Sequence, residues 1–383
     1  MTDQLDPNAT LPCPRCGAPF ELGDLFCEAC GEQLGAEAAD TDPLAAPAAA
    51  SATLPSDGVA ATPSPADTPA GSSDRSSPTA PAGPFGRTAP CVGCGAPPAD
   101  IETDGYCTVC GLLQPGPRDH LEVDLGWAAG VTDRGLHHPH NEDAFHLERV
   151  GPDADRGIVA VVCDGVSSSV HAEEAAETAS AAAATMLAAV VAGPGSLADA
   201  TVHAVDAANR AVTALPWTAA GNMASPSCTL VSAACRVGEV VVGWVGDSRV
   251  YWLGPPDGIR QLTVDDSWAE AQVEAGRMTE EEADADPRSH AITRWVGADA
   301  PALDAQVVTV VPGPAGRLLL CSDGLWNYAP TVKDMADLLA RQTYGATPIE
   351  LARSLTQFAR QSGGHDNITV VVIELGDRVA QEQ

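Results

Sequence analysis

The residues of this 383-residue chain with the clearest chemical potential are acidic side chains placed where apolar runs end or begin. Six carboxylates share this placement: Glu142, Asp143, Asp164, Asp247, Asp323 and Asp366. A single aspartate at such a point usually forms a turn, because a carboxylate is costly to bury unless it is hydrogen-bonded or binds a cation. The repetition instead favours one shared site for a hard cation. Carboxylate oxygens suit Mg²⁺ or Mn²⁺ better than zinc.

Eight of the twelve cysteines form a second group of metal-ligand residues, arranged as four C-x-x-C-G units. The pairs are Cys13/Cys16, Cys27/Cys30, Cys91/Cys94 and Cys107/Cys110. Two thiolates at this spacing can hold one ion from a tight turn, and two pairs give the tetrahedral four-thiolate site of structural zinc. The sequence therefore predicts zinc ribbons over residues 11–35 and 89–114, with about two structural Zn²⁺ ions in total.

Disulfides and redox motifs are the alternatives for these eight cysteines. The first residues are polar and do not resemble an export signal, and a redox pair is not expected four times. Acidic or neutral residues flank the pairs, which favours protein docking over nucleic-acid binding as the role of the ribbons. Four further cysteines are predicted to be inert buried thiols: Cys163, Cys228, Cys235 and Cys321. This use of cysteine predicts a reducing, cytoplasmic location.

The elements that must position the carboxylates are Val-rich strands and Ala-rich helices. Strands are expected at Gly157–Cys163, Leu230–Arg236, Glu239–Val245, Arg249–Leu253, Val307–Val311, Arg317–Cys321 and Ile368–Leu375, and consecutive helices at about Glu173–Val191 and Leu197–Leu215. Glu142 and Asp143 are expected to open the first strand of the domain. Clusters of strands with helices in consecutive pairs predict an α+β fold of antiparallel sheets with helices packed outside.

Composition divides the chain into four parts. The Ala/Pro-rich stretch 36–88 is predicted to be a disordered linker between the ribbons, and 121–376 one α/β-sized domain. The formal charge, 20 minus 52 or −32, disfavours nucleic acid and membrane surfaces as partners. The longest nearly apolar run, 179–192, is shorter than the roughly 20 residues of a spanning helix.

The acidic positions fall within a series of short motifs. In chain order these read Asn141-Glu142-Asp143, Val162-Cys163-Asp164-Gly165, Gly246-Asp247-Ser248-Arg249-Val250-Tyr251, Leu262-Thr263, Cys321-Ser322-Asp323-Gly324-Leu325-Trp326 and Asp366-Asn367-Ile368-Thr369-Val370. The series resembles the PPM-type metal-dependent protein phosphatases (protein phosphatase 2C family) and spans essentially Leu121 to Leu375. Residues 275–283, which lead into Ala291–Arg294, resemble the flap of that family.

The resemblance implies two antiparallel sheets sandwiched between helix pairs, and a site for two to three Mn²⁺ or Mg²⁺ ions. By position, Asp164 would bridge two ions, and Asp323 and Asp366 would complete the shell of one. Glu142 and the carbonyl of Gly165 would serve the other.

Two more acidic residues take roles from the same resemblance. Asp143 would hold metal-bound water, and Asp247 with Asp323 would form the third metal position of bacterial members. The implied activity is hydrolysis of phosphoserine and phosphothreonine by a metal-activated water, on a phosphorylated protein substrate linked to a kinase.

Three departures from the family pattern concern the surroundings of these ligands. His138 stands where the family has a phosphate-binding arginine, and Arg134 could substitute for it. Ser167 and its neighbours replace two glycines after Asp164-Gly165. Asp265-Asp266-Ser267 replaces the usual Asp-His-Ser. None of these changes removes a predicted metal ligand.

Three functional hypotheses follow. The first is an active phosphatase whose ribbons dock a partner or substrate, and the intact set of Asp164, Asp323 and Asp366 favours it. The second is a pseudo-phosphatase that acts as a phospho-ligand-binding adaptor, and His138 is its main argument. The third, a zinc-ribbon transcription factor, is disfavoured by the negative charge.

Overall fold

The computed structural model describes residues 90–376, except 92–93, 103–104, 112–113, 115, 152–156, 220–222, 256–257, 302, 312–314 and 343–344, together with two short strands near the N-terminus. The chain divides into two compact units, Met1–Pro81 and Ala82–Gln383. In the first unit, β1 (Thr10–Pro12) pairs antiparallel with β2 (Pro19–Glu21). Cys13, Cys16, Cys27 and Cys30 of the first predicted ribbon and the predicted linker 36–88 lie outside the described residues.

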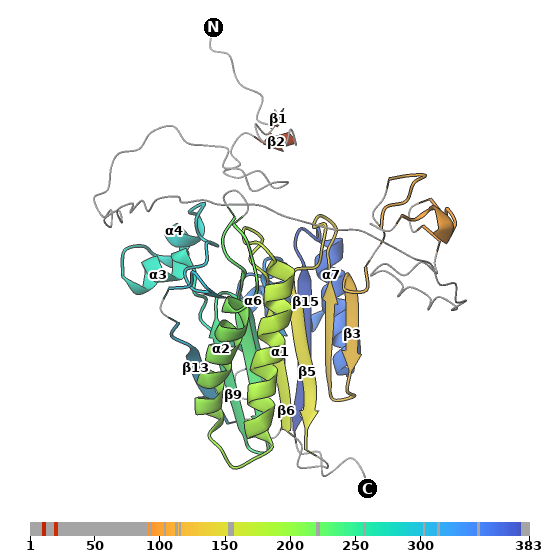
Figure 1. Cartoon of the computed structure of the whole chain (residues 1–383). Helices are drawn as coiled ribbons and strands as arrows, with labels where there is room; N and C mark the ends of the chain where they lie inside the picture. Colours follow the sequence, from red (N-terminus) through yellow and green to blue (C-terminus); the bar gives the residue numbers. More distant parts are fainter. Residues whose placement is uncertain are drawn as a thin grey trace, which may run out of the picture. The chain divides into compact units, whose positions relative to one another are not determined.

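The second unit contains two large sheets in which every strand pair is antiparallel (Figure 1). The six-stranded sheet has the order β11 (Gly258–Gln261), β10 (Arg249–Gly254), β14 (Ala315–Cys321), β15 (Ile368–Gly376), β4 (Ala128–Asp133), β3 (His120–Asp124). The five-stranded sheet has the order β13 (Gln306–Val310), β9 (Glu239–Val245), β8 (Leu230–Arg236), β6 (Gly157–Cys163), β5 (Ala144–Val150). A small ladder joins β7 (Ser227–Cys228) and β12 (Val296–Gly297).

Helices cover the outer face of each sheet. α1 (Ala172–Val191) and α2 (Leu197–Thr213) lie side by side against the five-stranded sheet (Figure 1). α5 (Asp323–Trp326), α6 (Val332–Ala340) and α7 (Pro348–Gln361) belong to the six-stranded sheet, and α3 (Trp268–Glu274) and α4 (Glu280–Asp284) form the segment that resembles the flap. A short 3₁₀ helix spans Pro98–Asp100. The predicted α-β-β-α arrangement is confirmed.

Alternating side chains hold the layers together. In β6, Val159 and Val161 pack into the cluster under α1 and α2, while Ile158 and Val162 pack into the cluster between the sheets. Both faces of this strand are buried, so its sequence is a continuous apolar run without polar alternation. In β15, Val370 packs into the cluster under α7, whereas Val371 and Ile373 pack into the cluster between the sheets. The core therefore has three apolar layers.

The predicted strand bounds hold for β6, β8 and β9 and shift by one or two residues in the others. The expectation that Glu142 and Asp143 open the first strand of the domain is wrong, because β3 and β4 precede them. β3 carries charged side chains at the edge of its sheet, and β4 is built largely from Ala and Gly. Gly130 of β4 leaves room for the ring of Phe145, which a Cβ there would meet at 2.4 Å. Neither strand has the Val-rich composition of β6, β9 and β15.

Two further features bear on the sequence predictions. Among the helices that the structure describes, none is long and apolar enough to cross a membrane. Cys163, Cys228, Cys235 and Cys321 are buried, as expected.

Candidate active site

The strand register brings the six carboxylates to one end of the two sheets. β6 ends at Cys163, which pairs with Ala144 at the start of β5, so Asp164 and Asp143 lie at the same end. β14 ends at Cys321, which pairs with Val370 of β15 and with Arg249 of β10. These strand ends are flanked by Asp323, Asp366 and Asp247, which therefore lie at the same end as Asp143 and Asp164. All three are far from Asp164 in the sequence.

Burial and mutual repulsion dominate the electrostatics of this group. Burial, followed by the negative charges of Asp143, Asp323 and Asp366, raises the pKa of Asp164 well above its usual range. Burial also raises the pKa of Asp143 to about 8 and, together with Asp366, that of Asp323 to about 7. Burial and the negative charge of Asp323 also raise the pKa of Asp247. So many acidic groups in one buried place are costly unless a cation compensates their charge.

Two carboxylate oxygens of the group are buried without a hydrogen-bond partner, Oδ1 of Asp143 and Oδ1 of Asp323. Their companion oxygens are held, since Ser322 Oγ donates to Asp143 Oδ2 at 2.7 Å and Asn327 Nδ2 to Asp323 Oδ2 at 3.2 Å. Orphaned carboxylate oxygens beside other carboxylates are the ligands that Mg²⁺ and Mn²⁺ prefer. The donor set therefore fits hard divalent cations.

Asn367 anchors the loop that carries Glu142. Its Oδ1 accepts the backbone N–H of Glu142 at 2.7 Å, and its Nδ2 donates to the carbonyls of Arg134 and His140. The side chain is 2% exposed, so these bonds are shielded from water. In the sequence Asn367 stands only within a motif, and this role was not predicted. Its position beside a predicted ligand was the available signal.

The segment after Gly165 is shaped by close backbone contacts. A Cβ on Gly165 would lie 2.7 Å from the carbonyl of Ala172 and 2.8 Å from that of Glu142, so only glycine fits. Ser167, one of the residues that replace the glycines of the family, donates its Oγ to Glu142 Oε2 at 2.6 Å. The departure at Ser167 thus gives Glu142 a hydrogen-bond partner.

The two candidate phosphate-binding residues have different surroundings. His138 lies beside the carboxylate group, with Nε2 3.3 Å from Asp366 Oδ1. The guanidinium of Arg134 donates to the Pro139 carbonyl and lies 3.7 Å from Asp119. Arg134 thus contacts its own loop, whereas His138 faces Asp366.

The residues that replace Asp-His-Ser tie the flap to the Asp247 turn. Asp265 forms a bidentate pair with Arg249, whose guanidinium lies 3.7 Å from the ring centroid of Trp326. Asp266 accepts hydrogen bonds from the Gly246 N–H and from Arg294. These pairings were not predicted from the sequence, because they join residues up to 28 positions apart.

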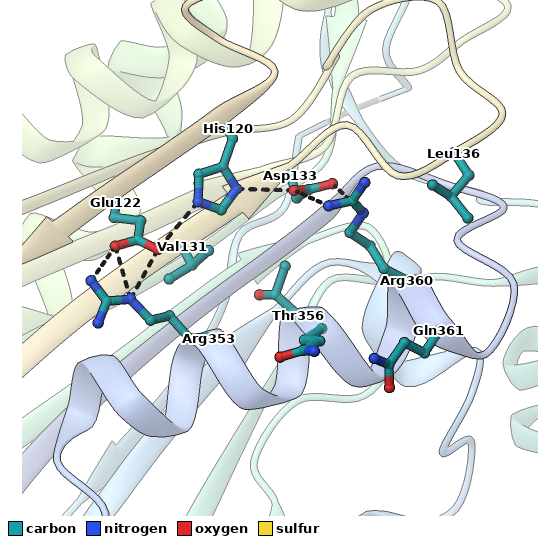
Figure 2. A pocket seen from close by; sticks show the side chains of 10 residues that line it. His120, Glu122, Val131, Asp133, Leu136, Arg353, Thr356, Arg360 and Gln361 are labelled. Atoms are coloured by element: carbon teal, nitrogen blue, oxygen red, sulfur yellow. Dashed lines mark hydrogen bonds and ion pairs between the residues drawn. The ribbon is translucent and has the colours of Figure 1, made fainter. Parts of the chain in front are cut away.

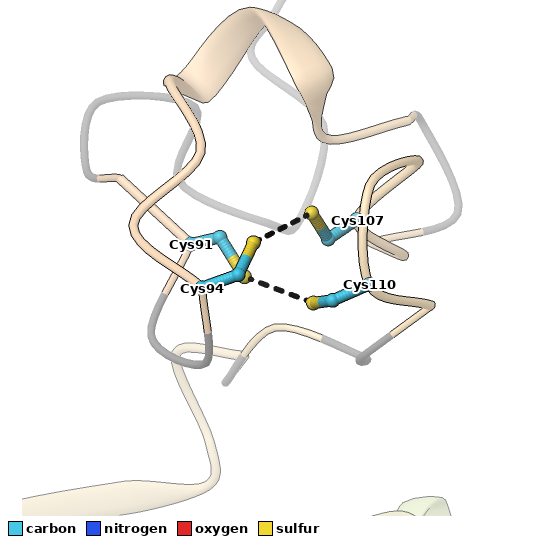
Figure 3. A group of neighbouring side chains, drawn as sticks. All are labelled: Cys91, Cys94, Cys107 and Cys110. Carbon is cyan, nitrogen blue, oxygen red and sulfur yellow. Dashed lines mark hydrogen bonds between the residues drawn. The ribbon is translucent and has the colours of Figure 1, made fainter.

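The second predicted zinc ribbon brings its four cysteines together (Figure 3). The Sγ atoms of Cys91 and Cys110 are 3.6 Å apart and those of Cys94 and Cys107 are 3.7 Å apart. A tetrahedron of thiolates around zinc has edges of about 3.8 Å, because each Zn–S bond is about 2.3 Å long. Each pair is followed by a glycine, Gly95 or Gly111, with a φ of 72°. The two pairs therefore end in the same kind of left-handed turn. The cluster fits a four-thiolate zinc site.

Comparison with known proteins agrees with this geometry. The family model for protein phosphatase 2C matches residues 137–360. The serine/threonine phosphatase stp of Listeria innocua is 35% identical over 146 residues, which cover 38% of this chain and 56% of that protein. For the serine/threonine protein phosphatase PstP of Mycobacterium tuberculosis the values are 38% over 138 residues, with 35% of this chain and 24% of that protein covered. The chain thus spans about half the length, or less, of these curated relatives.

Solved structures give the same result. The PPM Ser-Thr phosphatase MsPP from Mycobacterium smegmatis is 30% identical, with a TM-score of 0.51 over 65% of this chain and 98% of that one. A bacterial serine phosphatase is 25% identical, with a TM-score of 0.56 over 66% and 98% of the two chains. Because the family model covers more than half of the sequence, the chain belongs to the protein phosphatase 2C family.

Proposed function

We propose that this chain is a metal-dependent protein serine/threonine phosphatase that hydrolyses phosphoserine and phosphothreonine in a protein substrate. The observation that carries the proposal is the group of buried and half-buried carboxylates at one end of the sheets, two of which have orphaned oxygens. Relatives named serine/threonine phosphatases support the substrate class. The alternative of a pseudo-phosphatase has no support in these findings, because every predicted ligand is present.

The residues proposed to hold two to three Mn²⁺ or Mg²⁺ ions are Asp164, Asp323, Asp366, Glu142, the carbonyl of Gly165 and Asp247. Bound in this group, the ions would supply an activated water and neutralise the charge that develops on the phosphoryl group. Ser167 would orient Glu142, and Asn367 would fix its loop. Ser322 would orient Asp143 so that its other oxygen, Oδ1, accepts a hydrogen bond from the water.

The substrate phosphate is assigned to His138, with Arg134 as second candidate. An imidazole at the edge of the carboxylate group can donate to a phosphate oxygen that points away from the metal ligands. It lacks the fork of parallel donors that an arginine offers, so recognition by His138 would be weaker than by the arginine of the family.

The ribbons are proposed to bind about two structural Zn²⁺ ions. Cys91, Cys94, Cys107 and Cys110 support one of these sites by their geometry. Docking of a partner or substrate protein is the role proposed for the ribbons, and the kinase link and the cytoplasmic location stay predictions. The net charge argues against nucleic acid as a partner.

The test is hydrolysis of an aryl phosphate and of a phosphothreonine peptide by the purified chain. Activity should require Mn²⁺ or Mg²⁺ and disappear when the metal is chelated. Asp164→Ala and Asp323→Ala should each lower turnover at least about a thousandfold, because each removes a ligand of the ions that activate water. Asp337→Asn, which changes an exposed carboxylate on α6, is the matched control and should leave turnover unchanged. Wild-type turnover by the Asp164 or Asp323 variant would contradict the proposal.

A further inference from the structure

A cavity of about 630 Å³ lies between the edge of the six-stranded sheet and α7, and none of the six carboxylates is among its lining residues (Figure 2). Its charged lining consists of His120 and Glu122 of β3, Asp133 of β4, and Arg353 and Arg360 of α7. Its volume is in the range of pockets that hold small organic ligands.

The lining contains a buried hydroxyl without a partner. Thr356 of α7 is 3% exposed, and its Oγ1 has no hydrogen bond. A threonine inside a helix normally donates to the carbonyl four residues before it. Thr185 and Thr201 of this chain do so, at 2.9 and 2.8 Å. An unsatisfied buried hydroxyl costs stability, so the hydroxyl of Thr356 indicates a partner that the chain itself does not provide.

In the charged lining the carboxylate oxygens are already paired, whereas some N–H donors are not. Arg353, Glu122, His120, Asp133 and Arg360 form one continuous chain of pairs (Figure 2). Both oxygens of Glu122 face Arg353, and Oε1 also faces His120. Both oxygens of Asp133 are also occupied. Oδ1 is contacted by the N–H of Gly135 and by Nε of Arg360. Oδ2 is contacted by His120 and by Nη1 of Arg360.

A guanidinium has five N–H donors, and these pairs leave Nη1 of Arg353 and Nη2 of Arg360 outside them. We infer that this cavity binds a small organic anion that carries a carboxylate or a phosphate group. The two arginines would bind its oxygens and the Thr356 hydroxyl would donate to it.

The cavity shares residues with the loops of the proposed metal site. Asp133 accepts the N–H of Gly135, and a Cβ on Gly135 would lie 2.2 Å from the Asp366 carbonyl. Leu136 lines the cavity and donates its N–H to Gly364, two residues before Asp366. An anion bound at Nη2 of Arg360 would therefore act, through the Arg360–Asp133 pair, on a turn that packs against Asp366. This coupling rests on the proposed function, whereas binding of the anion does not.

The binding test uses the full chain in buffer without Mn²⁺ or Mg²⁺, at about 150 mM NaCl to screen the charge of the protein. Phthalate, phenylphosphonate and neutral benzamide are titrated by calorimetry. At least one of the two anions should bind at a single site and benzamide should not, and the anion that binds identifies the group recognised. If neither anion binds, or if benzamide binds equally well, the inference is wrong.

Variants locate the anion. Arg360→Gln and Arg353→Gln should each weaken binding about tenfold, and Thr356→Val about three- to tenfold. Thr185→Val on α1 is the control and should bind as the wild type does. Unchanged affinity in all three cavity variants would place the anion elsewhere and overturn the inference.

Coupling is tested by measuring Mn²⁺ affinity with and without the anion. The anion should change the affinity for Mn²⁺ about two- to tenfold. Mn²⁺ should change the affinity for the anion by the same factor, because linkage is reciprocal. An unchanged Mn²⁺ affinity would refute the coupling. Neither measurement needs turnover, so failure here is distinct from failure of the phosphatase proposal.

Discussion

Ser322 Oγ donates a 2.7 Å hydrogen bond to Asp143 Oδ2, and this bond joins the two sheets at their carboxylate end. Ser322 follows β14 of the six-stranded sheet and Asp143 precedes β5 of the five-stranded sheet. The same hydroxyl accepts the N–H of Thr369 at 2.9 Å. One buried side chain thus fixes Asp143 relative to the loops of Asp323 and Asp366.

Replacing Ser322 should therefore affect both stability and activity. Ser322→Ala leaves the Thr369 N–H and a carboxylate oxygen unpaired and should lower the free energy of unfolding by about 1–3 kcal/mol. Turnover should fall, because Asp143 loses its orientation. Urea unfolding and aryl phosphate hydrolysis measure the two effects. Ser225→Ala is the control, since Ser225 Oγ is buried without a partner, and its removal should leave the free energy of unfolding unchanged or raise it. Equal behaviour of the two variants would contradict this role of Ser322.

The stability of the protein without Mn²⁺ or Mg²⁺ should fall as pH rises. Burial raises the pKa of Asp143 to about 8 and that of Asp323 to about 7, whereas both titrate near 4 when unfolded. The folded state therefore binds more protons than the unfolded state between these values, and the stabilisation present below about pH 4 is lost as pH rises through 7 to 8. Thermal unfolding from pH 5 to pH 8.5 measures the slope.

Two comparisons test the origin of this slope. Mn²⁺ should raise the melting temperature more at pH 8 than at pH 5, because the ligands must lose their protons to bind it. Asp323→Asn should have a shallower slope than the wild type, since one raised carboxyl is gone. A slope that Asp323→Asn leaves unchanged would show that other groups cause it.

His138 should govern affinity for the phosphate more than turnover. His138→Ala should raise KM for a small phosphate several-fold, and His138→Arg should lower it, because a guanidinium offers two parallel donors. Arg134→Gln tests the alternative residue. If both His138 variants keep the wild-type KM while Arg134→Gln raises it, the phosphate is held by Arg134.

Zinc content should follow the cysteine pairs. The full chain should contain about two zinc equivalents, and Cys107→Ser with Cys110→Ser should contain about one, because a four-thiolate site does not survive the loss of two ligands. Hydrolysis of a small phosphate should be retained in this variant. Elemental analysis and the aryl phosphate assay provide the measurements, and Cys235→Ser, which changes a buried thiol outside the pairs, is the control. An unchanged zinc content would contradict the second ribbon.

The sequence by itself determined the acidic positions that are candidate ligands, the order of the motifs and most of the strands. β6, β8 and β9 have the expected bounds because they are buried on both faces, which requires unbroken apolar runs. Asp164, Asp323 and Asp366 could be identified because a charged residue at the end of such a run needs a reason to be there. The Thr331/Asp334 and Thr347/Glu350 pairs form capping boxes at the starts of α6 and α7, and this spacing is visible in the sequence itself.

Only the tertiary structure decided which residues support these ligands. β3 and β4 escaped prediction because an edge strand and a strand of small residues lack the apolar pattern that burial imposes elsewhere. The bonds of Asn367 to Glu142 and of Ser322 to Asp143 join residues 225 and 179 positions apart. A hydroxyl or amide has many possible partners along a chain. Its actual partner is fixed by the packing of two sheets, which no local pattern encodes.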